Sequence, residues 1–120
     1  MRAHAARTFP DECCGALLVD QTGVVSARPL DNAAVDRRHG FLVSARDSLR
    51  VEAHAEALGL TVVGYYHSHP DGPATPSERD AAAAWPERWT VIIPVHAGIA
   101  GPPRAFRFEG GRFFPLDGTG

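Results

Sequence analysis

The sequence predicts a single α+β domain, within the broad α/β class, in which helices flank a mixed and mostly antiparallel sheet. Three observations predict this architecture. A length of 120 residues, with 44% hydrophobic and 22% charged residues, is typical of one globular domain around one core. Short apolar runs of strand length alternate with segments of helical periodicity. Two pairs of predicted strands are joined by short turns that contain glycine, as in antiparallel hairpins.

Most of the predicted elements are strands, indicated by runs rich in β-branched and aromatic residues. The predicted strands cover residues 13–20, 24–30, 41–44, 61–69, 89–95 and the two arms of a hairpin over residues 104–116. The turn QTG joins the first two strands, and Gly110 with Gly111 forms the turn of the last hairpin. We therefore expect two hairpins within one sheet.

Three helices are predicted around these strands. A short helix covers residues 2–8, a longer one covers residues 45–60 with Gly59 as its C-cap, and a third begins at Ser77. The apolar face of the longer helix is predicted from residues at helical spacing, which are Leu49, Ala53, Ala57 and Leu58. No internal repeat or linker divides the chain, so residues 1–120 are expected to form one domain.

Composition and charge argue against several classes of function. The net charge is −2 and all twelve basic residues are scattered arginines, so no basic patch predicts a nucleic-acid partner. The apolar runs are far shorter than the roughly 20 residues of a membrane span, and the N-terminus lacks the apolar stretch of a signal peptide. The two cysteines, Cys13 and Cys14, are adjacent, a geometry that rarely forms a disulfide. We expect a cytoplasmic protein with reduced thiols and without nucleic-acid or membrane partners.

The segment HSHPDGPATPSERD carries the candidate chemistry. His67 and His69 are two residues apart on a predicted strand, so their imidazoles point to the same face. Asp80 is expected in the first turn of the next helix, which the intervening loop can fold back over the strand end. Two imidazoles and a carboxylate are ligand types of catalytic zinc sites. The spacing therefore favours a metal site.

A structural interpretation of the same segment is also open. The letters SERD match a capping box. In this motif the Ser77 side chain accepts a hydrogen bond from a backbone N–H, and the acid three residues later accepts one from the N–H of Ser77 in return. A carboxylate bound to zinc has less capacity left for a helix cap, so the two roles compete for Asp80. The capping box does not explain two same-face histidines at a strand end, but spacing alone leaves both interpretations standing.

The segment also resembles a known family. HSHPDGPATPSERD matches every specified position of H-x-H-x(7)-S-x(2)-D, the signature of the JAMM (MPN-plus) zinc metalloproteases, and PDECCG is similar to their segment around the catalytic glutamate. The resemblance covers most of the chain and implies a JAMM/MPN-plus domain with a cytidine-deaminase-like fold. It implies Zn²⁺ held by His67, His69 and Asp80 with water as the fourth ligand. It also implies Glu12 as general acid/base and Ser77 as hydrogen-bond donor to the oxyanion.

The resemblance further implies a reaction and a partner. The family hydrolyses peptide or isopeptide bonds after the C-terminal glycines of ubiquitin-fold proteins, and this chain resembles its compact stand-alone prokaryotic members. Some of those release cysteine from a sulfur-carrier protein. We therefore expect a zinc-dependent hydrolase that acts after the Gly-Gly end of a ubiquitin-like or sulfur-carrier protein, whose tail would pair with a strand edge. A RadC-like protein associated with DNA repair and a non-catalytic MPN scaffold are the alternatives.

Several positions stand outside this scheme. Family members begin with a strand and a longer helix, whereas this chain starts inside that helix. The first family strand is therefore expected to be missing or to lie upstream, and a homodimer would cover the exposed sheet edge. Asn32 resembles a family position near the substrate groove. The other histidines lack a partner at ligand spacing and are expected to be structural or solvated, namely His4, His39, His54 and His96.

Overall fold

The computed structural model describes residues 1–84 and 88–116. Its strands are β1 (Cys14–Val19), β2 (Val25–Leu30), β3 (Thr61–Pro70), β4 (Trp89–His96), β5 (Ile99–Ala100), β6 (Arg104–Glu109) and β7 (Arg112–Pro115). Its helices are α1 (Arg2–Thr8), α2 (Ala45–Leu58) and α3 (Glu78–Ala83). The predicted strand at residues 41–44 is absent from this part of the chain, and the two-residue β5 was not predicted.

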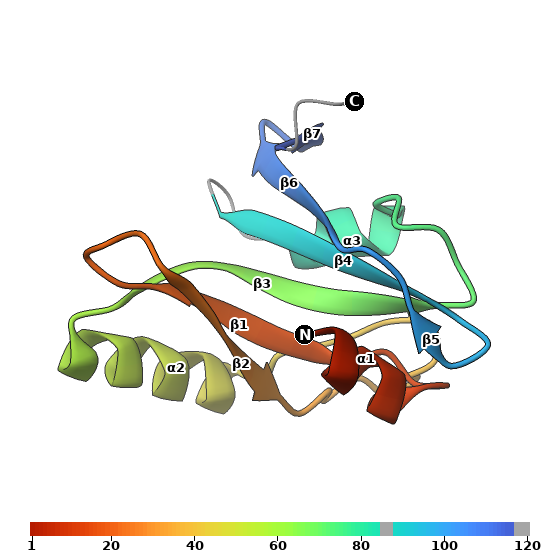
Figure 1. The fold of residues 1–120 in the computed structure, drawn as a ribbon, viewed down its shortest axis with the longest axis horizontal. Coiled ribbons are helices and arrows are strands. Elements are labelled where there is room, and N and C mark those ends of the chain that lie inside the picture. The colour runs from red at the N-terminus through yellow and green to blue at the C-terminus, as the bar shows by residue number, and fades with distance from the viewer. Residues whose placement is uncertain (85–87, 117–120) are drawn as a thin grey trace.

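One sheet runs through the molecule in the order β2-β1-β3-β4-β6-β7, with β5 paired to β4 (Figure 1). Among the described strands, β3 and β4 are parallel and the other neighbouring pairs are antiparallel. The expected mixed and mostly antiparallel sheet is confirmed. The sheet ends at β2 and β7, and the expected homodimer across an exposed edge stays a prediction. The domain limits of 1–120 also stay a prediction, since residues 117–120 lie outside the described part.

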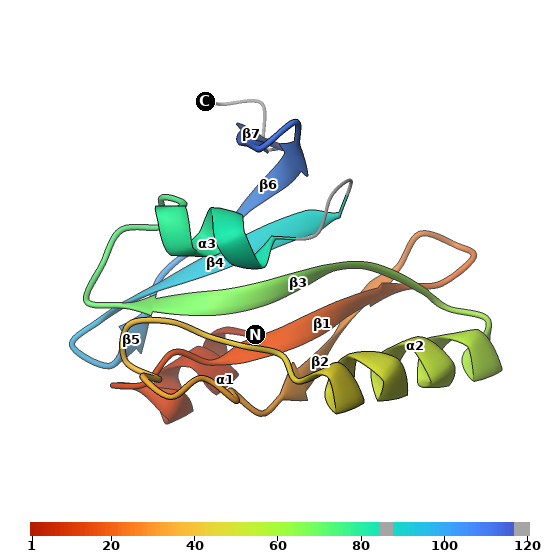
Figure 2. The ribbon, with the colours of Figure 1, turned by 180° about the vertical axis from the view of Figure 1, so that it is seen from behind.

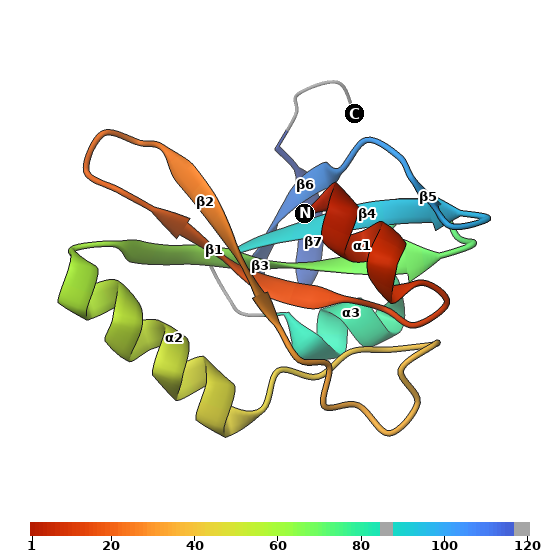
Figure 3. The ribbon, with the colours of Figure 1, turned by 60° about the horizontal axis from the view of Figure 1, so that its bottom comes forward.

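Helices cover the two faces of the sheet. On one face α1 packs through Ala5 against a cluster that includes Tyr66, and on the other α2 packs through Val51 and Ala55 against a cluster that includes Tyr65 (Figure 3). The two tyrosines are neighbours on β3 and point to opposite faces, so each belongs to the core on its own side of the sheet. None of the helices in the described ranges is long and apolar enough to cross a lipid bilayer.

The predicted apolar face of α2 is wrong. Leu49 and Leu58 are 72% and 59% exposed, whereas Val51 and Ala55 are buried against the sheet. Alanine-rich helical periodicity fits more than one face, and contact with the sheet selects among them. The predicted end of the helix is confirmed, because Gly59 adopts a left-handed φ of 68° as its C-cap.

The predicted strand over residues 41–44 is irregular backbone in the structure. The backbone N–H and carbonyl of Leu42 are already hydrogen-bonded to residues 32 and 33. The N–H of Leu42 donates to the Asn32 side chain at 3.1 Å, and the carbonyl of Leu42 accepts from the N–H of Ala33 at 2.8 Å. These local bonds take the place of a strand ladder.

The β3–α3–β4 crossover places the functional segment. β3 and β4 run in parallel, with α3 between them in the chain, so the end of β3 and the start of α3 are joined by one loop (Figure 2). Gly64 permits this close pairing, because a Cβ there would lie 2.2 Å from the carbonyl oxygen of Trp89. The crossover brings the predicted metal ligands to one end of the sheet.

Candidate metal centre

The candidate centre lies where β3 ends and α3 begins. His67 and His69 alternate with Ser68 on β3, so both imidazoles point to the face that α3 covers. Asp80 meets both of them, with 2.9 Å between His67 Nε2 and Oδ1 and 2.9 Å between His69 Nε2 and Oδ2. Within the described residues, these three form the group whose ligand atoms all lie within 4.8 Å of one another and could hold a metal ion.

The ionisation of His67 and Asp80 fits a cation. Burial opposes the charged form of Asp80, but hydrogen bonds from His67 and His69 outweigh it and hold the pKa of this carboxyl well below its usual range. Burial lowers the pKa of His67, so its imidazole stays neutral. The Nε2 atoms of the two histidines lie only 3.2 Å apart beside the carboxylate. Burial opposes the charged form of His69, but hydrogen bonds with Asp80 and with the Pro73 carbonyl outweigh it and raise the pKa of this imidazole, so metal binding would displace a proton from it. Two imidazoles and a carboxylate converging in this way are a donor set for a divalent metal.

The two histidines are oriented by different contacts. His69 Nδ1 lies 2.8 Å from the carbonyl oxygen of Pro73, which only accepts, so Nδ1 carries a hydrogen, and Nε2, 2.9 Å from Asp80 Oδ2, is the atom left to bind a metal in place of a proton. His67 Nδ1 is buried and has no hydrogen-bond partner in the described part of the chain. Its ring instead stacks on Phe41, with 4.3 Å between centroids and 17° between planes. The sequence does not predict this contact, because no motif includes Phe41.

Asp80 is also part of a helix cap. Ser77 Oγ accepts a hydrogen bond from the N–H of Asp80 at 3.1 Å, and Asp80 Oδ2 accepts one from the N–H of Ser77 at 2.8 Å. The two interpretations that the sequence left open are therefore compatible in one carboxylate. Because Ser77 Oγ is the acceptor in the cap, its own hydroxyl hydrogen stays free to donate.

Glu12 lies two residues before the start of β1, with a buried side chain. Its N–H donates to the carbonyl of Arg37 at 2.6 Å, and its carbonyl accepts from Asn32 Nδ2 at 2.9 Å. Carboxylate oxygen Oε1 has no hydrogen-bond partner among residues 1–84 and 88–116. Burial raises the pKa of Glu12 to about 7, while the charge of His69 lowers it and that of Asp80 raises it. This carboxyl can therefore exchange a proton near neutral pH.

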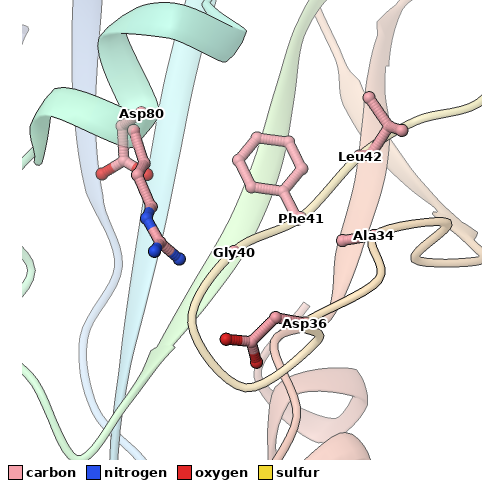
Figure 4. A pocket seen from close by; sticks show the side chains of 7 residues that line it. Ala34, Asp36, Gly40, Phe41, Leu42 and Asp80 are labelled. Carbon is pink, nitrogen blue, oxygen red and sulfur yellow. The ribbon is translucent and has the colours of Figure 1, made fainter.

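Three cavities surround these groups. One of about 530 Å³ is lined by Glu12, His69 and Ser77 among others. A second, of about 380 Å³, reaches Asp80 and Phe41 (Figure 4). A third, of about 460 Å³, lies against Glu12 and includes residues of α1. Four of the five residues singled out from the sequence, all except the buried His67, line these cavities, whose size suits a ligand. The roles of all five stay predictions.

The remaining histidines lie mostly outside the centre. His96 is 92% exposed, and His54 is exposed on α2. His39 is exposed and pairs with Asp36 at 2.9 Å, and it also lines the cavity of about 530 Å³. His4 lies 2.8 Å through its Nδ1 from the hydroxyl of Tyr66 and lines the cavity of about 460 Å³. None of the four takes part in the metal-ligand group found within the described residues.

Asn32 has a structural task beside the centre. Its Nδ2 donates to the carbonyls of Glu12 and Gly40 at 2.9 and 3.0 Å, and its Oδ1 accepts from the N–H groups of Ala34 and Leu42 at 3.0 and 3.1 Å. These four bonds use both amide hydrogens and both lone pairs of the side-chain oxygen. Asn32 therefore holds its loop against the segment of Glu12.

Comparison with known proteins shows relatives over most of the chain. The family described as prokaryotic homologs of the JAB domain matches residues 1–109. The chain is 34% identical over 88 residues to a desampylase of Haloferax volcanii, which covers 71% of this chain and 63% of that protein. It is 37% identical over 90 residues to the probable TtuB-protein conjugate cleaving protease of Thermus thermophilus, covering 75% and 58% respectively. The chain thus spans less than two thirds of the length of these relatives.

Solved structures show the same architecture. A protein of Desulfitobacterium hafniense has a TM-score of 0.81 at 27% identity, covering 96% of this chain and 82% of that one. A protein of Salinibacter ruber has a TM-score of 0.70 at 34% identity, with 97% and 82% covered. A JAB1/MPN domain protein of Archaeoglobus fulgidus has a TM-score of 0.57 at 18% identity, with 92% and 82% covered, which shows a shared fold. The fold expected from the resemblance is confirmed.

Proposed function

Because the chain belongs to the family of prokaryotic homologs of the JAB domain, we propose that it is a zinc-dependent hydrolase. Its substrate is the peptide or isopeptide bond that follows the C-terminal Gly-Gly of a ubiquitin-like or sulfur-carrier protein. The observation that carries the proposal is the convergence of His67, His69 and Asp80 beside the buried carboxyl of Glu12. Relatives named as a desampylase and as a TtuB-protein conjugate cleaving protease support the substrate class.

Zinc is the proposed metal, held by the Nε2 atoms of His67 and His69 and by the carboxylate of Asp80. Two nitrogen ligands and one oxygen ligand form a common set in catalytic zinc sites. When bound, zinc would act as a Lewis acid that lowers the pKa of a water molecule, so that a hydroxide nucleophile is available near neutral pH. The bond from His69 Nδ1 to the Pro73 carbonyl orients that ligand. The presence of all three ligands disfavours the scaffold alternative.

Glu12 and Ser77 supply the remaining chemistry. The unpartnered Oε1 of Glu12 accepts the proton of the attacking water. The same carboxyl then gives this proton to the amine that leaves, so Glu12 ends the cycle as it began. The free hydroxyl hydrogen of Ser77 donates to the scissile carbonyl oxygen as negative charge develops there. Both side chains line the cavity of about 530 Å³, as this division of roles requires.

A glycine-ended tail suits such a site. An extended tail can add to a strand edge through backbone hydrogen bonds, and glycine brings no side chain into the approach to the metal. The leaving group is either a lysine side chain or a free amino acid such as cysteine. Cys13 and Cys14 are buried and free, which supports a reducing, cytoplasmic setting for the reaction.

A cleavage assay tests the proposal. Ubiquitin-like carriers of the source organism, each with a C-terminal Gly-Gly-cysteine or a Gly-Gly-lysine isopeptide adduct, are incubated with zinc-loaded protein and weighed by mass spectrometry. We expect hydrolysis after the second glycine, and loss of hydrolysis in His67→Ala, in Asp80→Ala and in chelated wild type. Carriers that stay intact beside fully zinc-loaded protein would refute the activity. Duplex DNA binding at moderate salt would favour the RadC-like alternative.

A further inference from the structure

His67 lacks the support that a metal-bound histidine usually has. Such histidines donate their second ring N–H to a carboxylate, a carbonyl or a water, which fixes the ring orientation. His69 has this bond, from Nδ1 to the Pro73 carbonyl at 2.8 Å. The Nδ1 of His67 is buried, and no residue of the described part of the chain hydrogen-bonds to it. Among the described residues, contacts other than a hydrogen bond to Nδ1 therefore hold the plane of this ring.

Phe41 provides that contact. Its ring is stacked on the imidazole of His67, with centroids 4.3 Å apart and planes inclined by 17°. His67 is only 1% exposed, so its ring has little freedom on the side away from Phe41. Figure 4 shows Phe41 extending from its loop across β3, on the side where Asp80 lies on α3. A rotation of the imidazole would break the stack and meet packed neighbours.

Asn32 holds Phe41 in place through the backbone on both sides. The carbonyl of Gly40 accepts from Asn32 Nδ2 at 3.0 Å, and the N–H of Leu42 donates to Asn32 Oδ1 at 3.1 Å. The same Nδ2 also donates to the carbonyl of Glu12 at 2.9 Å. One amide group therefore fixes the support of a metal ligand relative to the proposed general base.

We infer that Phe41 is a positioning residue for the metal, whose stacked ring replaces the hydrogen bond that His67 lacks. The inference rests on the proposed metal site and deepens it. Phe41 acts through His67, because a phenyl ring offers no ligand atom to an ion. A loop residue outside the H-x-H and S-x-x-D segment therefore sets how tightly the centre holds its metal, and Asn32 keeps this support in register with Glu12.

Metal affinity of Phe41 variants tests the inference. Phe41→Leu and Phe41→Met keep apolar bulk but lose the flat ring. The dissociation constant for Zn²⁺, measured by chelator competition, should therefore rise about 10-fold, which is the lower end of the loss in metal affinity seen when a ligand loses its supporting contact. Phe41→Tyr keeps the stack and should stay within about twofold of wild type. Leu42→Ala is the matched control, because Leu42 lines the same cavity without a stack on His67, and its affinity should not change.

Two further measurements separate positioning from folding. The metal-free Leu and Met variants should melt close to wild type, because swaps that conserve volume are tolerated. The absorption spectrum of the Co²⁺-loaded protein should change in these two variants and be restored in Phe41→Tyr. Wild-type Zn²⁺ affinity in both variants would overturn the inference, and so would an equal loss in Leu42→Ala. Failure of wild type to bind Zn²⁺ would instead refute the proposed metal site and the inference with it.

Discussion

Glu12 illustrates how the position of one residue sets a response to pH. In the metal-free protein, burial raises the pKa of Glu12 to about 7, compared with an ordinary value of 4.5. Between these values the folded protein keeps a proton that the unfolded chain has released. The stability that this group contributes is therefore fully present below about pH 4.5 and is lost as the pH rises through about 7.

Glu12→Gln is expected to remove this dependence. In the presence of chelator, the variant should gain stability relative to wild type as the pH rises from 4.5 to 7, with a constant difference above that range. Urea unfolding at several pH values measures the difference. A difference that does not vary with pH would contradict the raised pKa.

In zinc-loaded protein, the same Glu12→Gln variant should keep its metal and lose about 10²- to 10⁴-fold in kcat.

Ser77 offers a test that separates a cap from a catalyst. Ser77→Ala removes the acceptor for the N–H of Asp80, so it should cost about 1 kcal/mol of stability. If the hydroxyl also donates to the oxyanion, kcat should fall by about 10²-fold or more. Ser77→Asp keeps a capping acceptor but places negative charge at the oxyanion, so it should stay stable and lose activity. A stable and fully active Ser77→Asp protein would leave Ser77 with a structural role alone.

At the scale of elements, α2 provides a matched pair of substitutions. Val51 is 1% exposed and faces the sheet, whereas Leu49 is 72% exposed on the same helix. Val51→Ala should lower the free energy of unfolding by about 2 kcal/mol, through lost burial and a small cavity. Leu49→Ala should change it by less than about 0.5 kcal/mol. Urea denaturation compares the two variants. A larger loss of stability in Leu49→Ala would mean that the face predicted from the sequence is the buried one.

Elements with strong local signals could be predicted from the sequence. β3, the β6–β7 hairpin and the C-cap at Gly59 depend on composition, turn residues and a left-handed glycine, which act over a few neighbouring residues. The segment 41–44 could not be predicted, because the Asn32 side chain takes the N–H of Leu42 from ten residues away. β5 is two residues long and has no periodicity to detect.

The residues of the candidate centre likewise divide into those that the sequence predicts and those that only the folded structure reveals. His67, His69 and Asp80 follow from a strand, a loop and a helix start that are continuous in the sequence, so their convergence could be predicted. Glu12 was placed by resemblance, because no local pattern links it to residues more than fifty positions away. Phe41 could not be found in either way, since its stack on His67 exists only after the loop is folded.

For the whole molecule, a metal that binds only the folded state adds to its stability. At a free zinc concentration about 100 times the dissociation constant, this gain is about 2.7 kcal/mol. For a domain of this length it corresponds to a rise in melting temperature of about 10 °C. Calorimetry with zinc and with chelator measures the rise, and Asp80→Ala should show none. Equal melting temperatures for wild type in the two conditions would contradict a zinc site.

The double use of the Asp80 carboxylate has an evolutionary consequence. Oδ2 accepts from the N–H of Ser77 and faces His69, while Oδ1 faces His67, so one side chain joins the start of α3 to the end of β3. Asparagine would replace one acceptor with a donor, and glutamate would shift both oxygens by a methylene group. A lineage that loses the metal ligand here through an apolar residue therefore also loses a hydrogen bond that holds the start of α3, so such a loss of the centre also destabilises the fold.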